Sequence, residues 1–289
     1  MQSLREIIAD ARARKVAVGH FNVSNIEGVW AIVHAARALK VPVIIGLSEG
    51  ERDFVGVRQA VAFVRSVREE YDQPVFINAD HTYSLDRVRE AVDADFDAVI
   101  FDGAQLSVEE NIATTTACVR YARARSHDQL VEGELGYIGT SSKILDQIPD
   151  GAAVTTDTLT TSEEAAAFVT ATGVDLFAPA VGSIHGMLRT THDPDLAIER
   201  IASIAAAVST PLVLHGASGL REENLRAAIA AGISVVHINT ELRLAYRDAV
   251  KLSLTDDTDQ IAPYKIMKPA VLAMQKLVEQ KLKLFNRLT

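Results

Sequence analysis

Short apolar runs rich in β-branched residues alternate with Ala-rich helical segments eight times along the 289-residue chain. The runs are apolar on both faces, as a parallel sheet buried under helices requires. Eight strand–helix units in about 250 residues predict an α/β fold of the (β/α)8 TIM barrel type, whereas a doubly wound sheet would normally use fewer strands. The expected strands are Val16–Phe21, Pro42–Leu47, Pro74–Ala79, Ala98–Asp102, Leu130–Glu134, Asp175–Ala180, Pro211–His215 and Ser234–Asn239.

Two segments exceed this repeat, and we expect them to be additions to a single barrel domain covering residues 1–289. Residues 136–160 are far longer than an ordinary strand-to-helix loop and predict a mobile loop over the site. From about residue 260 a C-terminal tail predicts a helix from Pro263 to Phe285, packed on the barrel or on a second subunit. The helices expected within the repeat are Glu27–Leu39, Phe54–Glu70, Leu85–Ala94, Val108–Arg125, Ser162–Thr172, Asp195–Val208, Glu222–Ala231 and Glu241–Lys251.

Composition excludes several classes of partner. The net charge of −9 argues against a nucleic-acid surface. No apolar run approaches the roughly 18 residues that span a bilayer, and the N-terminus lacks the apolar stretch of a signal peptide. The single cysteine, Cys118, excludes an internal disulfide and is expected to be a small core residue. We therefore expect a cytoplasmic protein of enzyme size that binds neither nucleic acid nor membrane.

Polar side chains gather at one end of the predicted barrel. Barrel active sites lie at the carboxyl ends of the strands. The opposite ends of the strands begin with residues that carry no such polar side chains, for example Val41-Pro42. This asymmetry indicates catalysis. The residues at or just after the carboxyl ends are Asn22, Ser48, Asp80, His81, Asp102, Glu132, Glu134, His185, His215, His237, Asn239 and Thr240.

Three of these residues, His81, His185 and His215, predict a metal site. Each follows an apolar run, and the gaps between them are far too long for a zinc finger, so that the fold must assemble any shared site. Three imidazoles with Asp80 beside one of them suit a catalytic zinc that keeps an open coordination position. None of the nine lysines ends a strand, which excludes Schiff-base chemistry in the barrel mouth.

Glycine-rich turns on the same rim predict a phosphate site. Gly216–Gly219 follows the seventh strand and opens a helix, and free backbone N–H groups at such a turn suit an anion. Asn239 and Thr240 begin the helix after the eighth strand, and phosphate sites after strands seven and eight recur in these barrels.

Taken together, these stretches resemble the class II, zinc-dependent fructose-bisphosphate and tagatose-bisphosphate aldolase family. The similar segments run in family order over residues 4 to 250. They are His20–Asn25, Asn78–His81, Ala98–Gly103, Glu109–Ile112, Val131–Gly136, Gly182–Gly186, Leu212–Gly219 and Asn239–Leu242.

The resemblance implies roles for individual residues. His81, His185 and His215 would bind the catalytic zinc, and Asp80 would be the acid–base at the C4 hydroxyl. Asp102 and Glu134 match positions that hold a second or displaced divalent metal, or a monovalent cation. The positions that match a substrate site are Gly186, Gly216, Ala217, Ser218, His237, Asn239 and Thr240 for dihydroxyacetone phosphate, Asn22 near its enediolate, Ser48 in the second-strand loop, and Arg243 for a second phosphate.

The chain also departs from the family pattern. The family loop carries a Gly-Gly pair followed by acids, one of which shuttles protons to the enediolate, but Gly139–Lys143 lacks this acid. Either Asp146 or another residue substitutes for it, or that half-reaction is slower or different. On the eighth strand His237 replaces an asparagine that touches substrate, and Asn239 stands where Asp or Ala is frequent.

The resemblance therefore implies reversible, metal-dependent cleavage of fructose 1,6-bisphosphate in glycolysis, with Arg243 favouring a bisphosphate. Tagatose 1,6-bisphosphate differs only at C4 and stays an alternative, as does another ketose (bis)phosphate. A zinc hydrolase is a different class, but it would usually show a His-x-His pair where this chain has the single His20. A catalytically silent barrel is disfavoured by Asp80 and the three histidines. The resemblance to this family and the apolar C-terminal tail predict a homo-oligomer, either a dimer or a tetramer.

Overall fold

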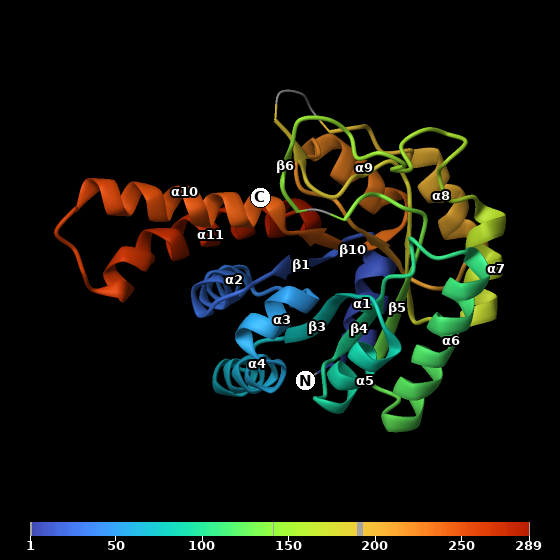
Figure 1. The fold of residues 1–289 in the computed structure, drawn as a ribbon, viewed down its shortest axis with the longest axis horizontal. Coiled ribbons are helices and arrows are strands. Elements are labelled where there is room, and N and C mark those ends of the chain that lie inside the picture. The colour runs from blue at the N-terminus through green and yellow to red at the C-terminus, as the bar shows by residue number, and fades with distance from the viewer. Residues whose placement is uncertain (1, 141, 190–192, 289) are drawn as a thin grey trace.

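The computed structural model describes residues 2–140, 142–189 and 193–288 and contains a closed barrel of eight parallel strands ringed by helices (Figure 1). Neighbouring strands follow the order β1-β10-β9-β7-β5-β4-β3-β2 around the barrel. The predicted (β/α)8 barrel is thus confirmed. Its strands are β1 (Val18–Asn22), β2 (Val43–Leu47), β3 (Val75–Thr82), β4 (Ala98–Phe101), β5 (Leu130–Leu135), β7 (Leu176–Pro179), β9 (Leu212–Leu214) and β10 (Ile233–Ile238).

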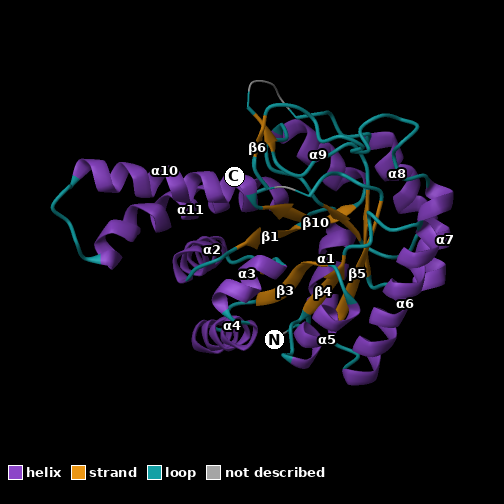
Figure 2. Cartoon of the chain, viewed as in Figure 1, coloured by secondary structure: helices purple, strands orange, loops and turns teal. Residues whose placement is uncertain are grey.

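Helices cover the outside of the barrel, as Figure 2 shows. One prediction was wrong, because the segment expected as a single helix over residues 54–70 is two helices. Ser48 and Glu51 form a capping box that starts a helix earlier, and Gly56, at φ +93°, separates it from the next. The helices are α1 (Leu4–Arg14), α2 (Ile26–Leu39), α3 (Glu49–Val55), α4 (Val57–Tyr71), α5 (Leu85–Asp93), α6 (Val108–Arg125), α7 (Ser162–Thr172), α8 (Ile198–Ala207), α9 (Glu222–Ala231), α10 (Thr240–Asp256) and α11 (Pro263–Asn286).

Helix α1 closes the amino end of the barrel. Its buried residues Leu4, Ile7 and Ile8 belong to one apolar cluster with inward-facing strand residues such as Phe76 and Val213. Burial of a side chain of this size contributes about 1.5–3 kcal/mol. Because this end is filled with apolar side chains, the carboxyl ends of the strands are left for polar chemistry.

The long segment after β5 is held over the carboxyl ends of the barrel strands by a short strand pair. Its short strand β6 (Ile144–Leu145) pairs in parallel with β8 (Met187–Leu188), which lies in the connection after β7. Gly186 precedes β8 at φ +107°, where a Cβ atom would collide with the main-chain oxygen of Lys143. The two connections therefore form one small sheet above the barrel, and the expected position of this segment over the site is confirmed.

The predicted tail helix is α11. It lies along α10 and α2, and the α10–α11 hairpin projects from the barrel wall (Figure 1). Its last turns carry Leu282 and Phe285 into the core shared with the barrel strands. Within residues 2–140, 142–189 and 193–288, no helix is both long and apolar enough to cross a bilayer.

A buried arginine anchors the end of β2 to that of β3. The side chain of Arg52 in α3 is fully buried. Its guanidinium donates to the main-chain oxygens of Leu47 (2.6 Å) and Asp80 (3.0 Å) and to Thr82 Oγ1 (3.1 Å). Removal of this side chain would leave a cavity and buried acceptors without their donor, which is costly in a protein interior.

We therefore expect Arg52→Ala to lower the free energy of unfolding by about 3 kcal/mol, measured by guanidinium denaturation. The exposed Arg58 on the following helix provides the control, and Arg58→Ala should change the free energy by less than about 0.5 kcal/mol. Equal stability of the two variants would contradict the anchoring role.

Candidate active site

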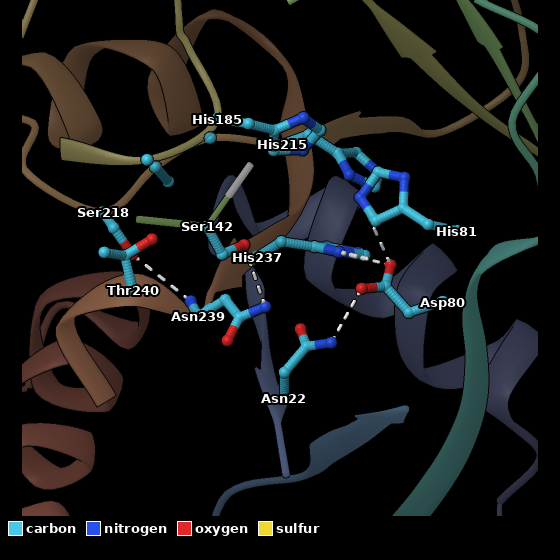
Figure 3. A pocket seen from close by; sticks show the side chains of 13 residues that line it. Asn22, Asp80, His81, Ser142, His185, His215, Ser218, His237, Asn239 and Thr240 are labelled. Carbon is cyan, nitrogen blue, oxygen red and sulfur yellow. Dashed lines mark hydrogen bonds and ion pairs between the residues drawn. The ribbon is translucent and has the colours of Figure 1, made fainter. Parts of the chain in front are cut away.

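Most of the residues singled out in the sequence meet in one pocket at the carboxyl ends of the strands (Figure 3). They come from five barrel strands (β1, β3, β7, β9 and β10) and the connections that follow them, which are distant in sequence but share one rim of the barrel. Ser142, from the long segment after β5, completes the lining. The predicted residues in this pocket are Asn22, Asp80, His81, His185, Gly186, His215, Gly216, Ala217, Ser218, His237, Asn239 and Thr240.

A local irregularity in β3 turns Asp80 and His81 toward the same pocket. Successive side chains of a regular strand point to opposite faces. Here the register between β3 and β4 shifts between Ala79 and Thr82, and His81 has φ +41°, a conformation that is strained for a side chain with a Cβ. Such strain is frequently found at functional sites. The bulge therefore lets two neighbouring residues serve one site.

The rings of His81, His185 and His215 converge. The ring centroids lie 4.7 Å (His81–His185), 4.9 Å (His81–His215) and 5.9 Å (His185–His215) apart, with the ring planes nearly perpendicular. One nitrogen from each ring can be chosen so that all three lie within 4.8 Å of one another. Three imidazoles in this arrangement can share a metal ion.

Each of these histidines uses one ring nitrogen to bond to the protein and leaves the other available. His81 Nδ1 lies 2.9 Å from Asp102 Oδ2, and His185 Nδ1 lies 2.6 Å from the main-chain oxygen of Gly139. His215 Nε2 lies 2.7 Å from Glu132 Oε1. Its buried Nδ1 has no hydrogen-bond partner among the described residues. A metal ligand needs this division of roles, so the donor set fits a zinc ion.

The protonation state of the pocket also suits a cation. Burial, reinforced by His81, lowers the pKa of His185 to about 4, and burial beside His237 lowers the pKa of His215 well below its ordinary value. Burial alone would lower the pKa of His81, but Asp80, Glu134 and Asp102 outweigh it and raise the pKa well above its ordinary value. Two rings are thus neutral, and a bound divalent ion would take the place of the proton on the third.

A second group of donors lies beside the first. His81, Asp102 and Glu134 also bring one ligand atom each within 4.8 Å of the others. Burial and the nearby Asp102 raise the pKa of Glu134 well above its ordinary value, and its buried Oε1 has no hydrogen-bond partner in the part of the chain that the structure describes. The group has the composition expected for the second or displaced cation that the sequence predicts.

One carboxylate oxygen of Asp80 accepts a hydrogen bond, and the other has no hydrogen-bond partner among the described residues. Asn22 Nδ2 donates to Oδ2 (2.8 Å). Oδ1 lies 3.5 Å from His237 Nδ1 and 3.9 Å from His81 Nε2. Burial raises the pKa of the Asp80 carboxyl, but the neighbouring rings of His81 and His237 outweigh it and hold this pKa well below its ordinary value. His237 in turn stacks on His20, with ring centroids 3.5 Å apart.

The opposite wall of the pocket is built from main chain. Gly216 has φ +62°, and a Cβ atom there would collide with the main-chain oxygen of Ile184. Ser218 Oγ accepts from the N–H groups of Asn239 (3.2 Å) and Glu241 (3.4 Å) and so fixes the start of α10 beside the glycine turn. A turn and a helix N-terminus that face one pocket form a cradle suited to a phosphate group.

Six residues named in the sequence do not line this pocket. Asp102, Glu132 and Glu134 contact its histidines from behind, whereas Ser48, Arg243 and Asp146 lie farther away. Ser48 and Arg243 both contact Glu51, and Arg243 with Glu51 lines a neighbouring cavity. Asp146 forms an exposed ion pair with Arg189 (2.8 Å), and its side chain is 83% exposed. The structure thus gives no support to Asp146 as the substitute for the missing loop acid.

The sequence placed Glu132 on the rim without a role, and it did not single out Ser142 or Glu51. Glu132 and Glu134 are two residues apart on β5, a spacing that turns both into the barrel and could have paired Glu132 with a histidine. Ser142 and Glu51 carry no such signal, because each reaches the site from a connection whose path only the folded chain reveals.

A closed parallel barrel with three convergent histidines and a buried carboxylate on its rim defines the class of metal-centred barrel enzymes. Comparison with known families narrows this class. Residues 2–288 match the family model described as "Fructose-bisphosphate aldolase class-II". The chain belongs to the class II fructose-bisphosphate aldolase family, and it is therefore an aldolase, a carbon–carbon lyase of a metal-dependent family.

Three relatives illustrate the similarity. A fructose-bisphosphate aldolase of Geobacillus stearothermophilus is 35% identical over 287 residues, which cover 98% of this chain and 96% of the relative. A 6-phospho-5-dehydro-2-deoxy-D-gluconate aldolase of Shouchella clausii is also 35% identical, over 97% of this chain and 92% of the relative. The crystal structure of the YdjI aldolase from Escherichia coli K12 superposes with a TM-score of 0.82 at 29% identity, over 98% of this chain and 96% of that one.

The hydrogen bond between Glu132 and His215 leads to a prediction for zinc affinity. Glu132→Gln keeps the shape of the side chain but can place an amide N–H where Oε1 now bonds His215 Nε2. The ring is then held less firmly, so we expect zinc affinity to fall by about tenfold or more in a competition titration with a chelator. Glu163→Gln, at an exposed position on α7, is the matched control and should bind zinc normally. Unchanged affinity in Glu132→Gln would contradict this assignment.

Proposed function

We propose that this protein is a zinc-dependent aldolase that cleaves fructose 1,6-bisphosphate reversibly to dihydroxyacetone phosphate and glyceraldehyde 3-phosphate. One observation carries the proposal: a single pocket joins the three histidines, the Asp80 carboxylate and a main-chain cradle suited to phosphate. Metal-dependent aldol cleavage of a sugar phosphate uses a Lewis-acid site, a base and a phosphate site together. The family match favours this reaction over the hydrolysis considered for a zinc barrel.

In this proposal His81, His185 and His215 hold the zinc ion. Bound zinc supplies Lewis acidity, which stabilises the negative charge that develops beside the substrate ketone. The glycine turn at Gly216 and the start of α10 at Thr240 bind the C1 phosphate through main-chain N–H groups and so fix the ketone end of the substrate.

Asp80 acts at the bond that breaks. Asn22 holds its Oδ2, so Oδ1 is left to accept the proton of the C4 hydroxyl as the C3–C4 bond cleaves. In the direction of condensation the same atom returns this proton. The low pKa of the carboxyl keeps Asp80 ionised and ready to accept.

The overall similarity to known relatives does not identify the sugar substrate. Two relatives of equal identity are named for different aldolases, one for fructose bisphosphate and one for 6-phospho-5-dehydro-2-deoxy-D-gluconate. Fructose 1,6-bisphosphate is our first choice because the matching family model and a 35% identical relative bear its name. Tagatose 1,6-bisphosphate presents the same two phosphates and is the second choice.

We further propose that the protein works in the cytoplasm, in glycolysis or related carbohydrate metabolism, as a homo-oligomer. The α10–α11 hairpin supports assembly, because it carries exposed apolar side chains away from the barrel (Figure 1). Exposed apolar surface of this kind marks interaction sites. The residues concerned are Leu252, Leu254, Ile261, Tyr264 and Leu272.

Metal dependence is tested directly by assay. Zinc-loaded protein should release dihydroxyacetone phosphate from fructose 1,6-bisphosphate, and removal of the metal with a chelator should abolish the release until zinc is restored. Release that survives complete removal of the metal would overturn the zinc mechanism.

Asp80→Asn tests the acid–base. The amide keeps the shape and the contact with Asn22 but cannot accept the hydroxyl proton, so we expect kcat to fall by about a hundred- to ten-thousand-fold with zinc content unchanged. Asp86→Asn, an 88% exposed position on α5, should keep full activity. Near-normal turnover in Asp80→Asn would refute its role.

A further inference from the structure

Arg243, the residue expected to meet a second phosphate, is already paired with a carboxylate. Its guanidinium lies 2.6 Å from Glu51 Oε1. The other oxygen, Oε2, accepts from Asn22 Nδ2 (3.0 Å), from Ser48 Oγ (2.9 Å) and from the Ser48 N–H (2.8 Å). Glu51 thus links Arg243, on α10, to the Asn22 amide that also holds Asp80.

The carboxylate is the fixed member of this pair. The Glu51 side chain is 7% exposed, whereas that of Arg243 is 46% exposed. The capping box at the start of α3 and the bond from Asn22 hold Glu51 in place independently of the arginine. The Arg243 side chain can therefore move when a substrate binds, whereas the Glu51 carboxylate stays in place.

The pair lies beside the active-site pocket. Glu51 and Arg243 line a neighbouring cavity, and Asn22 lines both. The main-chain cradle at Gly216 and the three histidines form other parts of the pocket lining. Asn22 also donates to both Asp80 and Glu51. A substrate whose C4 hydroxyl meets Asp80 would therefore have this cavity next to its aldehyde half.

The chemistry of this cavity differs from that of a bare phosphate site. A carboxylate accepts hydrogen bonds and donates none, so it matches sugar hydroxyls. It repels a phosphate dianion, and its ion pair with Arg243 cancels much of the attraction that a free guanidinium would offer.

We propose that Glu51 is a specificity-determining residue that makes the second phosphate dispensable. The substrate class then includes ketose 1-phosphates whose aldehyde half carries hydroxyl groups in place of a phosphate. The inference rests on the proposed aldol cleavage and adds the recognition of the aldehyde end.

The test compares kcat/KM for fructose 1,6-bisphosphate with kcat/KM for fructose 1-phosphate in zinc-loaded protein. The wild type should cleave the two sugars with values within about tenfold of each other. Glu51→Gln keeps the contacts with Asn22 and Ser48 but frees Arg243, and it should raise the ratio in favour of the bisphosphate by about tenfold or more. The ratio cancels any loss that affects both sugars equally.

Two further variants sharpen the test. Asp53→Asn makes the same change of charge on the same helix, at a 65% exposed side chain, and should leave the ratio unchanged. Adding Arg243→Gln to Glu51→Gln should return the ratio to the wild-type value, because the gain requires the freed arginine. A ratio that Glu51→Gln does not move would overturn the inference alone. Cleavage of neither sugar by the wild type would overturn the proposed function and the inference with it.

Discussion

The active site depends on how three histidine rings are held. Asp102, the Gly139 carbonyl and Glu132 each bond one nitrogen of a histidine, and the other nitrogens are left to converge. Burial keeps His185 and His215 neutral by lowering their pKa values, while carboxylates surround His81 and raise its pKa. A cluster of this kind is costly without a cation, because buried carboxylates and orphaned ring nitrogens must then be accommodated without compensation. A bound metal would therefore complete the structure as well as the chemistry.

Other parts of the fold position these groups at one rim of the barrel. Helix α1 fills the amino end of the barrel with apolar side chains, so polar residues accumulate at the other. The bulge in β3 allows Asp80 and His81 to share the pocket, and Arg52 holds the main chain there by bonding the Asp80 carbonyl. Positioning of the Asp80 carboxylate thus depends on a buried guanidinium that does not line the pocket.

The sequence alone predicted the barrel, the placement of the three histidines and Asp80 on one rim, and the glycine turn near Thr240. These features follow from periodicity and from the rule that barrel strands present their carboxyl ends together. Contacts between distant connections were not accessible in this way. The pairing of Glu51 with Arg243 joins α3 to α10, and His20 stacks on His237 across β1 and β10. The break at Gly56 was missed because its flanks share one helical periodicity, whereas the φ of +93° is set by the packing of α3.

Diffraction from zinc-loaded crystals at the zinc absorption edge shows whether His81, His185 and His215 share one zinc ion. We expect a single strong anomalous peak about 2.0–2.1 Å from Nε2 of His81, Nε2 of His185 and Nδ1 of His215. A principal peak at the alternative group of His20, Asp80 and His237, whose ligand atoms also lie within 4.8 Å of one another, would contradict it.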